Sequence, residues 1–258
     1  MPARPRLIAL LLALAVTVLA GCSDGSAAAD REPGDPVTSE EADTLAGLLH
    51  RNVTEGGADV TVTAPYAEGA VLTLTGEVDF ASGTGRAQAV TTGSTGQATE
   101  SRTLFFTDTD LWYGDVPGLT EALAAAGRPG ATYLERPLSP LQAGGTASLV
   151  DVLVQLVLNL AAPADDDPRA ILERGYTWQG QRTVDGQLAS VYRTGSGATV
   201  VVSAEDELLL QYVTRLPDQT FDVTITLGDH GSRTITLPDD AETALVADYP
   251  QIADELGF

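Results

Sequence analysis

The chain has no lysine, and arginine supplies all 14 of its basic residues against 36 acidic ones. The formal net charge is therefore −22 at pH 7. Nucleic-acid binding needs a basic surface that neutralises phosphates, so this class of partner is excluded. Anionic lipid headgroups would also repel so acidic a body, and attachment to a membrane would need a covalent anchor. We interpret the acidity as a contribution to solubility.

The chain also lacks a hydrophobic run long enough to cross a membrane. The run Leu7–Leu19 has about 13 residues, whereas a spanning helix needs roughly 20. The other strongly apolar stretch, Leu149–Leu160, is interrupted by Asp151, Gln155 and Asn159. The sequence therefore predicts no transmembrane helix.

Only one cysteine is present, and it ends the segment Leu19–Cys22, which reads Leu-Ala-Gly-Cys. Arg4 and Arg6 precede the apolar run, so the charged, apolar and small-residue regions of a secretory signal occur in their usual order. Leu-Ala-Gly-Cys resembles a bacterial lipobox, which implies cleavage after Gly21 and a lipid-modified Cys22. An ordinary secreted protein with a chance cysteine is the alternative.

The lipobox predicts where the protein is located. We expect residues 1–21 to be a lipoprotein signal peptide, and Cys22 to anchor the protein to the extracytoplasmic face of the cell membrane. Since the single thiol would be acylated, no disulfide, zinc–thiolate site or cysteine nucleophile is expected. Loss of Arg4 and Arg6 with the signal leaves 12 arginines against 36 acidic residues, a formal charge of −24.

Composition separates a linker from the folded part of the mature chain. Residues 22–37 are small, polar and rich in proline and acidic residues, so they cannot form a core and predict a flexible tether. The segment Thr38–Glu41 has the form of a capping box and predicts a helix that ends near Asn52. Residues 38–258 are expected to form one domain.

Alternating apolar and polar residues predict most of this domain to be antiparallel strands. One example is the segment 72–80, and another is the segment 221–227. Asp185-Gly186 is a strong hairpin signal, Ile235 and Leu237 predict a last strand, and residues 241–256 predict a final helix. About ten antiparallel strands in two meanders, with helices inserted between them, predict an α+β fold.

Residues 144–161, from Gly144 to Ala161, predict a helix that is apolar in nearly every direction. Its polar residues Asp151, Gln155 and Asn159 are spaced by four and form one narrow stripe. A helix of this kind is buried on most sides. Two interpretations remain open: a central core helix in a tightly packed domain, or a helix that lines an apolar cavity inside a curved sheet.

Residues suited to catalysis or metal binding are few. The two histidines are His50, on the first predicted helix, and His230, in a predicted turn. There is no Gly-x-Ser-x-Gly elbow, and no group of acidic residues and histidines has the spacing of metal ligands. The acidic run Asp165–Asp167 is better explained as a loop that ends in a helix N-cap. The sequence therefore predicts no enzyme, no metal site and no cofactor.

Several segments, taken in their order along the chain, resemble those of the actinobacterial LppX/LprG lipoprotein family. They are the lipobox, the tether, the first helix, the strand-turn segment Leu74–Gly83, the middle helices, and the segment Gln181–Gly186 that leads into Val191–Tyr192. The resemblance extends over the mature chain. It implies a LolA-like fold: a strongly curved antiparallel sheet has helices on its concave face and encloses a hydrophobic cavity that carries acylated lipids or lipoglycans.

The predicted function is binding and transport of an acylated lipid or lipoglycan by a lipid-anchored envelope protein, with a membrane transporter as a further partner. The alternative is a binding or sensor lipoprotein of the same fold that transports nothing and docks a membrane protein. Each candidate for the cavity wall would look the same as an ordinary core residue. The candidates are Leu72, Leu74, Val78, Phe80, Phe105, Leu149, Leu153, Leu156, Val157, Leu160, Val223 and Ile225.

Overall fold

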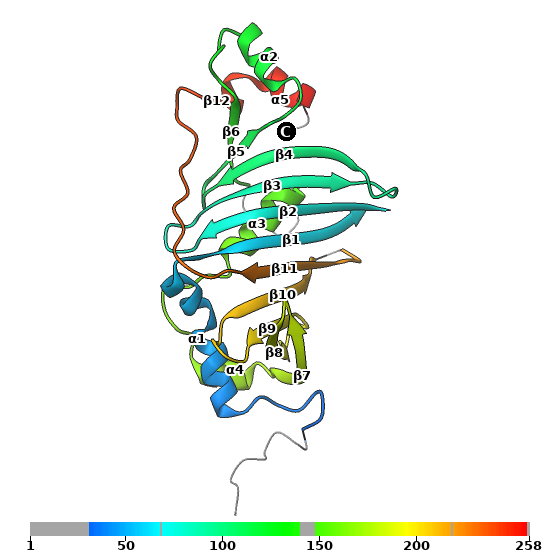
Figure 1. The fold of residues 1–258 in the computed structure, drawn as a ribbon, viewed down its shortest axis with the longest axis vertical. Helices are drawn as coiled ribbons and strands as arrows, with labels where there is room; N and C mark the ends of the chain where they lie inside the picture. Colours follow the sequence, from blue (N-terminus) through cyan, green and yellow to red (C-terminus); the bar gives the residue numbers. More distant parts are fainter. Residues whose placement is uncertain (1–30, 68, 140–147, 218, 257–258) are drawn as a thin grey trace, which may run out of the picture. The chain divides into compact units, whose positions relative to one another are not determined.

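The computed structural model describes residues 31–67, 69–139, 148–217 and 219–256 (Figure 1). The folded unit begins at Glu32. The predicted signal peptide and the predicted lipidation site, Cys22, lie outside the described residues. In the described part, no helix is long and apolar enough to cross a membrane.

The chain forms runs of consecutive strands with helices before, between and after them, as in an α+β fold (Figure 1). The helices are α1 (Ser39–Glu55), α2 (Leu119–Ala125), α3 (Leu149–Leu158), α4 (Pro168–Glu173), the short 3-10 helix η1 (Val246–Asp248) and α5 (Pro250–Leu256). The strands are β1 (Gly57–Ala67), β2 (Ala70–Asp79), β3 (Thr84–Thr92), β4 (Ala98–Phe106), β5 (Asp110–Gly114), β6 (Tyr133–Pro137), β7 (Thr177–Val184), β8 (Gln187–Arg193), β9 (Thr199–Ser203), β10 (Leu209–Arg215), β11 (Asp222–Gly228) and β12 (Thr243–Leu245).

The strands of the described residues form one 12-stranded sheet in the order β12-β6-β5-β4-β3-β2-β1-β11-β10-β9-β8-β7. Strands β1 to β6 form one antiparallel meander and β7 to β11 form a second. The antiparallel pairing of β1 with β11 joins the two meanders. Strand β12 pairs with β6 in parallel, so the sheet is mixed. The predicted α+β class is confirmed, and the prediction of about ten strands, all antiparallel, is corrected to twelve strands with one parallel pair.

Local sequence signals explain where several elements begin. In α1, Thr38 and Glu41 form the predicted capping box, because each side chain bonds the backbone N–H of the other residue. Helix α4 begins with Asp167 as N-cap and Pro168 in its first turn, as predicted. Asp185 and Gly186 both have positive φ, at 47° and 87°, which is the geometry of a tight hairpin turn between β7 and β8.

One face of the sheet, here called the inner face, carries the main hydrophobic core. Cross-strand pairing places Val60, Leu74 and Leu104 on this face, in phase along β1, β2 and β4. The buried side of α3, with Leu153 and Val154, belongs to the same core cluster, and the other four α-helices contribute to it as well. A single shared core makes the described unit one domain.

The end of the predicted tether is part of the folded unit. Pro36 forms a β-bridge with Thr177, and the Gly34 N–H donates to the carbonyl oxygen of Trp178 at 2.8 Å. Val37 is buried in the main core. The prediction that residues 22–37 are a free tether is therefore wrong for residues 34–37, because they pair with the first strand of the second meander.

Four further elements differ from the predictions. Ile235 and Leu237 lie in an irregular segment between β11 and β12 and form no strand, because neither residue pairs with a strand of the sheet. Residues 241–256 form β12, η1 and α5 in place of one helix. Helix α1 extends to Glu55, beyond the predicted end near Asn52, and α3 ends at Leu158. The predicted start of the latter helix, at residue 144, lies outside the described residues.

Candidate ligand cavity

A cavity of about 260 Å³ lies between the inner face of the sheet and the N-terminal end of α3. Its apolar lining comes from strands β2, β3 and β4 and from the first turn of α3. Its polar lining carries two arginines and one glutamate. The lining residues are Tyr66, Leu72, Ala89, Thr91, Glu100, Arg102, Leu104, Tyr113, Arg136, Ser148, Leu149 and Val150.

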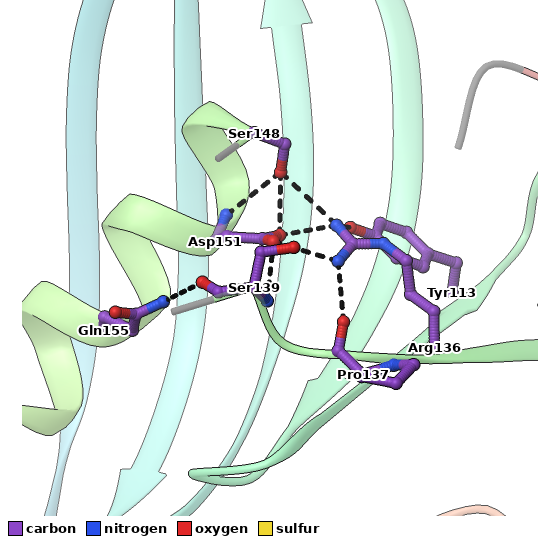
Figure 2. A network of polar contacts seen from close by, with 7 residues as sticks. All are labelled: Tyr113, Arg136, Pro137, Ser139, Ser148, Asp151 and Gln155. Carbon is purple, nitrogen blue, oxygen red and sulfur yellow. Dashed lines mark hydrogen bonds and ion pairs between the residues drawn. The ribbon is translucent and has the colours of Figure 1, made fainter. Parts of the chain in front are cut away.

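A polar network fastens α3 beside this cavity (Figure 2). Ser148 is the N-cap of α3, and its hydroxyl accepts the Asp151 backbone N–H at 3.2 Å. The same hydroxyl donates to Asp151 Oδ1 at 2.7 Å. Asp151 Oδ2 also accepts from Arg136 Nη1 and from the Ser139 N–H, both at 3.0 Å. The network therefore ties α3 to β6 and to the segment that follows it.

Arg136 is the centre of this network because β6 directs its side chain to the inner face. It pairs across the sheet with Leu111, which is fully buried on that face. Its guanidinium forms an ion pair with Asp151 and donates to Tyr113 Oη at 2.7 Å. Its Cζ also lies 5.3 Å from the centroid of the Tyr113 ring, within the range of a cation–π contact.

The predicted polar stripe on the middle helix has a structural use in this network. Asp151 is 1% exposed and binds Arg136, while Gln155 donates to the carbonyl oxygen of Ser139. Asn159 is exposed and forms the C-cap of α3. The first two polar residues therefore face the segment after β6, and only the last faces solvent.

Burial and hydrogen bonding set the protonation states in the network. Burial acts to raise the pKa of the Asp151 carboxyl, but the hydrogen bonds from Arg136, Ser148 and the Ser139 N–H, together with the charge of Arg136, outweigh it and hold this pKa below its ordinary value. Burial acts to lower the pKa of Arg136, but the hydrogen bonds and charge interactions with Asp151 and Tyr113 together outweigh it and raise this pKa. Burial raises the pKa of Tyr113. At pH 7 the network therefore holds an ion pair and a neutral phenol.

A second arginine, Arg102, also lies on the cavity wall. It is on β4, in phase with the buried Leu104, and its side chain is 20% exposed. It forms an ion pair with Glu100, whose side chain is 44% exposed. Arg102 Nη2 also donates to the carbonyl oxygen of Leu256, at the end of α5, at 3.4 Å. Its charge lies close enough to act on the pKa of Tyr113.

Most of the wall residues predicted from the sequence lie in the close-packed core. Leu72 and Leu149 line the cavity. Leu156 is partly buried and packs against the main core. Apart from Phe105, the remaining predicted residues are buried in that core and do not line the cavity: Leu74, Val78, Phe80, Leu153, Val157, Leu160, Val223 and Ile225.

The prediction for Phe105 is wrong. Leu104 and Phe106 alternate with it along β4 and occupy the inner face, so Phe105 lies on the opposite face. There its ring contacts the Tyr133 ring edge-to-face, with centroids 5.8 Å apart and planes at 82°. Phe105 is apolar like its two neighbours, but successive residues of a strand point to opposite faces of the sheet, so Phe105 cannot share the inner face with Leu104 and Phe106.

The polar lining of the cavity was not predicted from the sequence, although the alternation of residues along the strands could have indicated it. Glu100 and Arg102 alternate in phase with the buried Leu104 and Phe106 along β4, so both are directed to the inner face. Arg136 has the same relation to the buried Leu134. Charged residues at positions that belong to the core side of a strand mark a polar site within it.

Neither of the two histidines lines the cavity. His50 Nδ1 lies 3.3 Å from the carbonyl oxygen of Ala162. His230 lies just after β11, and burial lowers the pKa of its imidazole, so that the ring is neutral at pH 7. Among the described residues, no group of histidine, cysteine and acidic side chains could hold a metal ion.

Comparison with known proteins adds little to this description. No family model matches the chain, and no curated protein matches it. Among solved structures, the chain is similar to the crystal structure of an uncharacterized conserved protein from Thermus thermophilus, with 12% sequence identity and a TM-score of 0.38. The match covers 80% of this chain and 98% of that chain. A similarity this low carries no argument about function.

Proposed function

We propose that this protein is a lipoprotein of the LppX/LprG type, anchored through Cys22 to the extracytoplasmic face of the cell membrane, with a LolA-like fold that binds an acylated lipid or lipoglycan. The observation that carries the proposal is the cavity beside α3. Its floor is apolar, with Leu72, Leu104 and Leu149, and its rim is polar. An acyl chain is stabilised by about 0.8 kcal/mol for each CH₂ that leaves water, and a polar rim suits the headgroup of such a ligand.

The size of the cavity limits the ligand. About 260 Å³ is near the lower end of the volume of ligand pockets, which is roughly 300–1,000 Å³. We therefore propose that the cavity accommodates one acyl chain or part of one. A carrier of this kind would hold a lipid by a single chain and leave the headgroup and further chains outside.

Filling the cavity provides the test of acyl binding. Ala89→Trp is expected to abolish binding of a fluorescent acyl probe, because Ala89 lines the cavity and an indole would occupy its volume. Val90→Trp, on the opposite face of β3, is the matched control and should retain binding. Binding is measured by probe fluorescence, with native mass spectrometry to detect lipid that copurifies. Equal probe binding by the two variants, or no binding by the wild type, would argue against the cavity as the site.

The anchor is tested separately. Cys22→Ser is expected to move the protein from the membrane fraction to the soluble fraction of a bacterial host, because serine cannot receive the thioether-linked lipid. Fractionation followed by immunoblotting, together with incorporation of labelled palmitate, measures the change. Unchanged membrane association of Cys22→Ser would show that the lipobox is not used.

The second candidate function is a binding or sensor lipoprotein that docks a membrane protein and carries no lipid. The close packing around α3 favours it, because Leu153, Val157 and Ile225, which a long channel beneath the helix would expose, are buried in the core. In this case the cavity would be a site for a small ligand or for a partner residue. Cross-linking that captures a membrane protein, from preparations in which no lipid copurifies, would favour this function over carriage.

A further inference from the structure

We infer that Arg102 selects an anionic headgroup, a carboxylate or a phosphate, for the acyl chain that enters the cavity. This inference rests on the proposed acyl-binding function and adds the chemistry of the ligand's polar end. The chain as a whole is strongly acidic, with 36 acidic residues against 14 arginines. The cavity lining reverses this ratio, since it carries two arginines and one carboxylate.

The two arginines differ in how firmly they are engaged. Arg136 is 14% exposed and bonds Asp151, Tyr113 Oη and the Pro137 carbonyl oxygen, so its charge is neutralised by a carboxylate that is itself 1% exposed. Exchange of that partner for a ligand would leave Asp151 buried and unpaired, which is strongly unfavourable. Arg136 is therefore a structural residue of the wall.

Arg102 has an exchangeable partner. Its ion pair is with Glu100, whose side chain is 44% exposed and can be hydrated when the pair separates, while its hydrogen bond to the Leu256 carbonyl oxygen at 3.4 Å can persist. Exchange of Glu100 for the anion of a ligand leaves the Glu100 carboxylate hydrated and the 20%-exposed guanidinium still paired, so no buried charge loses its partner. The guanidinium presents a planar set of donors that matches the two oxygens of a carboxylate or phosphate. An anionic headgroup can therefore take the place of Glu100 on Arg102.

The position of Arg102 also fits the headgroup of a ligand whose chain lies on the apolar floor. Its β4 neighbour on the same face is Leu104, and its cross-strand partner is Ala89; both line the cavity. The residue on its other side along β4 is Glu100, which is exposed. The arginine thus stands between the apolar floor and solvent, at the boundary that the polar end of an amphiphile occupies.

The test compares decanoate and decyl phosphate with the neutral 1-decanol, by calorimetry or by displacement of a fluorescent acyl probe. Wild-type protein is expected to bind the two anions about tenfold more tightly than decanol, as expected for a hydrogen bond to a charged group. Arg102→Gln should remove this preference and leave the affinity for decanol unchanged. Glu100→Gln should tighten the binding of both anions, because it removes the competing carboxylate. Arg102→Lys should retain part of the preference.

Arg86→Gln is the matched control, since Arg86 lies on the opposite face of β3 and pairs with Glu77 at 2.8 Å. It should leave all three affinities unchanged. An anion preference that persists in Arg102→Gln overturns the inference but leaves acyl binding intact. Weaker anion binding by Glu100→Gln also overturns it, because Glu100 would then assist the ligand. Absence of binding for all three probes in wild-type protein contradicts the proposed function itself. Thermal unfolding of each variant confirms that it is folded.

Discussion

Asp151→Ala is expected to lower the free energy of unfolding by about 3–5 kcal/mol, the usual cost of removing one partner of a buried ion pair. The Asp151 side chain is 1% exposed and forms an ion pair with Arg136, which is 14% exposed. The substitution would leave the guanidinium buried without its carboxylate and would free the Ser139 N–H. It would also remove the acceptor of the Ser148 hydroxyl at the start of α3. Urea or guanidinium denaturation measures the change.

A double variant shows that charge, and not packing, causes the loss. Asp151→Leu combined with Arg136→Met replaces the pair by apolar residues of similar volume, and it should recover most of the stability, since such replacements are often neutral or stabilising. A double-mutant cycle gives the coupling energy of the two side chains. Coupling near zero would mean that the pair does not fasten α3 to β6.

The pH dependence of stability follows from the same pair. Because the pKa of Asp151 is held below its ordinary value, the ion pair contributes fully above the ordinary pKa of an aspartate, about 3.9. This contribution is lost as the pH falls through the lower pKa of the folded state, where the carboxylate takes up a proton. The double variant should therefore lose less stability in acid than the wild type does.

Leu153→Ala is expected to lower the free energy of unfolding by about 2–5 kcal/mol, the range for truncation of a fully buried leucine. Leu153 lies in the middle of α3, is 0% exposed and belongs to the core that also contains Leu74 and Ile225. The loss combines the lost burial of apolar surface with the cost of the space left behind. Chemical denaturation of wild type and variant gives the difference.

Leu172→Ala on α4 is the control, because Leu172 is 42% exposed and a surface substitution usually changes stability by less than about 0.5–1 kcal/mol. A loss for Leu153→Ala no larger than that of the control would mean that α3 is loosely packed along its length. That outcome would favour a cavity that continues beneath the helix, and hence the carriage of longer chains.

Elements with local signals were predicted well. The capping box of Thr38 and Glu41, the N-cap Asp167 and the Asp185-Gly186 turn are all confirmed, because each depends on residues within four positions of one another. The class of the fold follows from the number and order of such elements. The strand at Ile235 and Leu237 was predicted wrongly, since alternation alone does not provide an edge with which a strand can pair.

Contacts between distant segments were beyond the reach of the sequence. Strand β12 was missed because it is three residues long and is defined by its parallel pairing with β6, a strand far earlier in the chain. Phe105 was assigned to the wrong face, although the alternation of Leu104 and Phe106 could have placed it. The polar stripe of the middle helix was predicted, but its partner Arg136 on β6 was not.

The sequence by itself determined the composition-based exclusions, the lone cysteine in its lipobox-like setting, the α+β class and the apolar character of the middle helix. Each of these depends on residue types or on short-range order along the chain. Only the tertiary structure decided which apolar residues fill the core and which line the cavity, and that Arg102, Arg136 and Tyr113 share its wall. The reason is physical: whether a residue lines the cavity depends on strand register and on the position of α3 against the sheet. Both are set by packing between segments far apart in sequence.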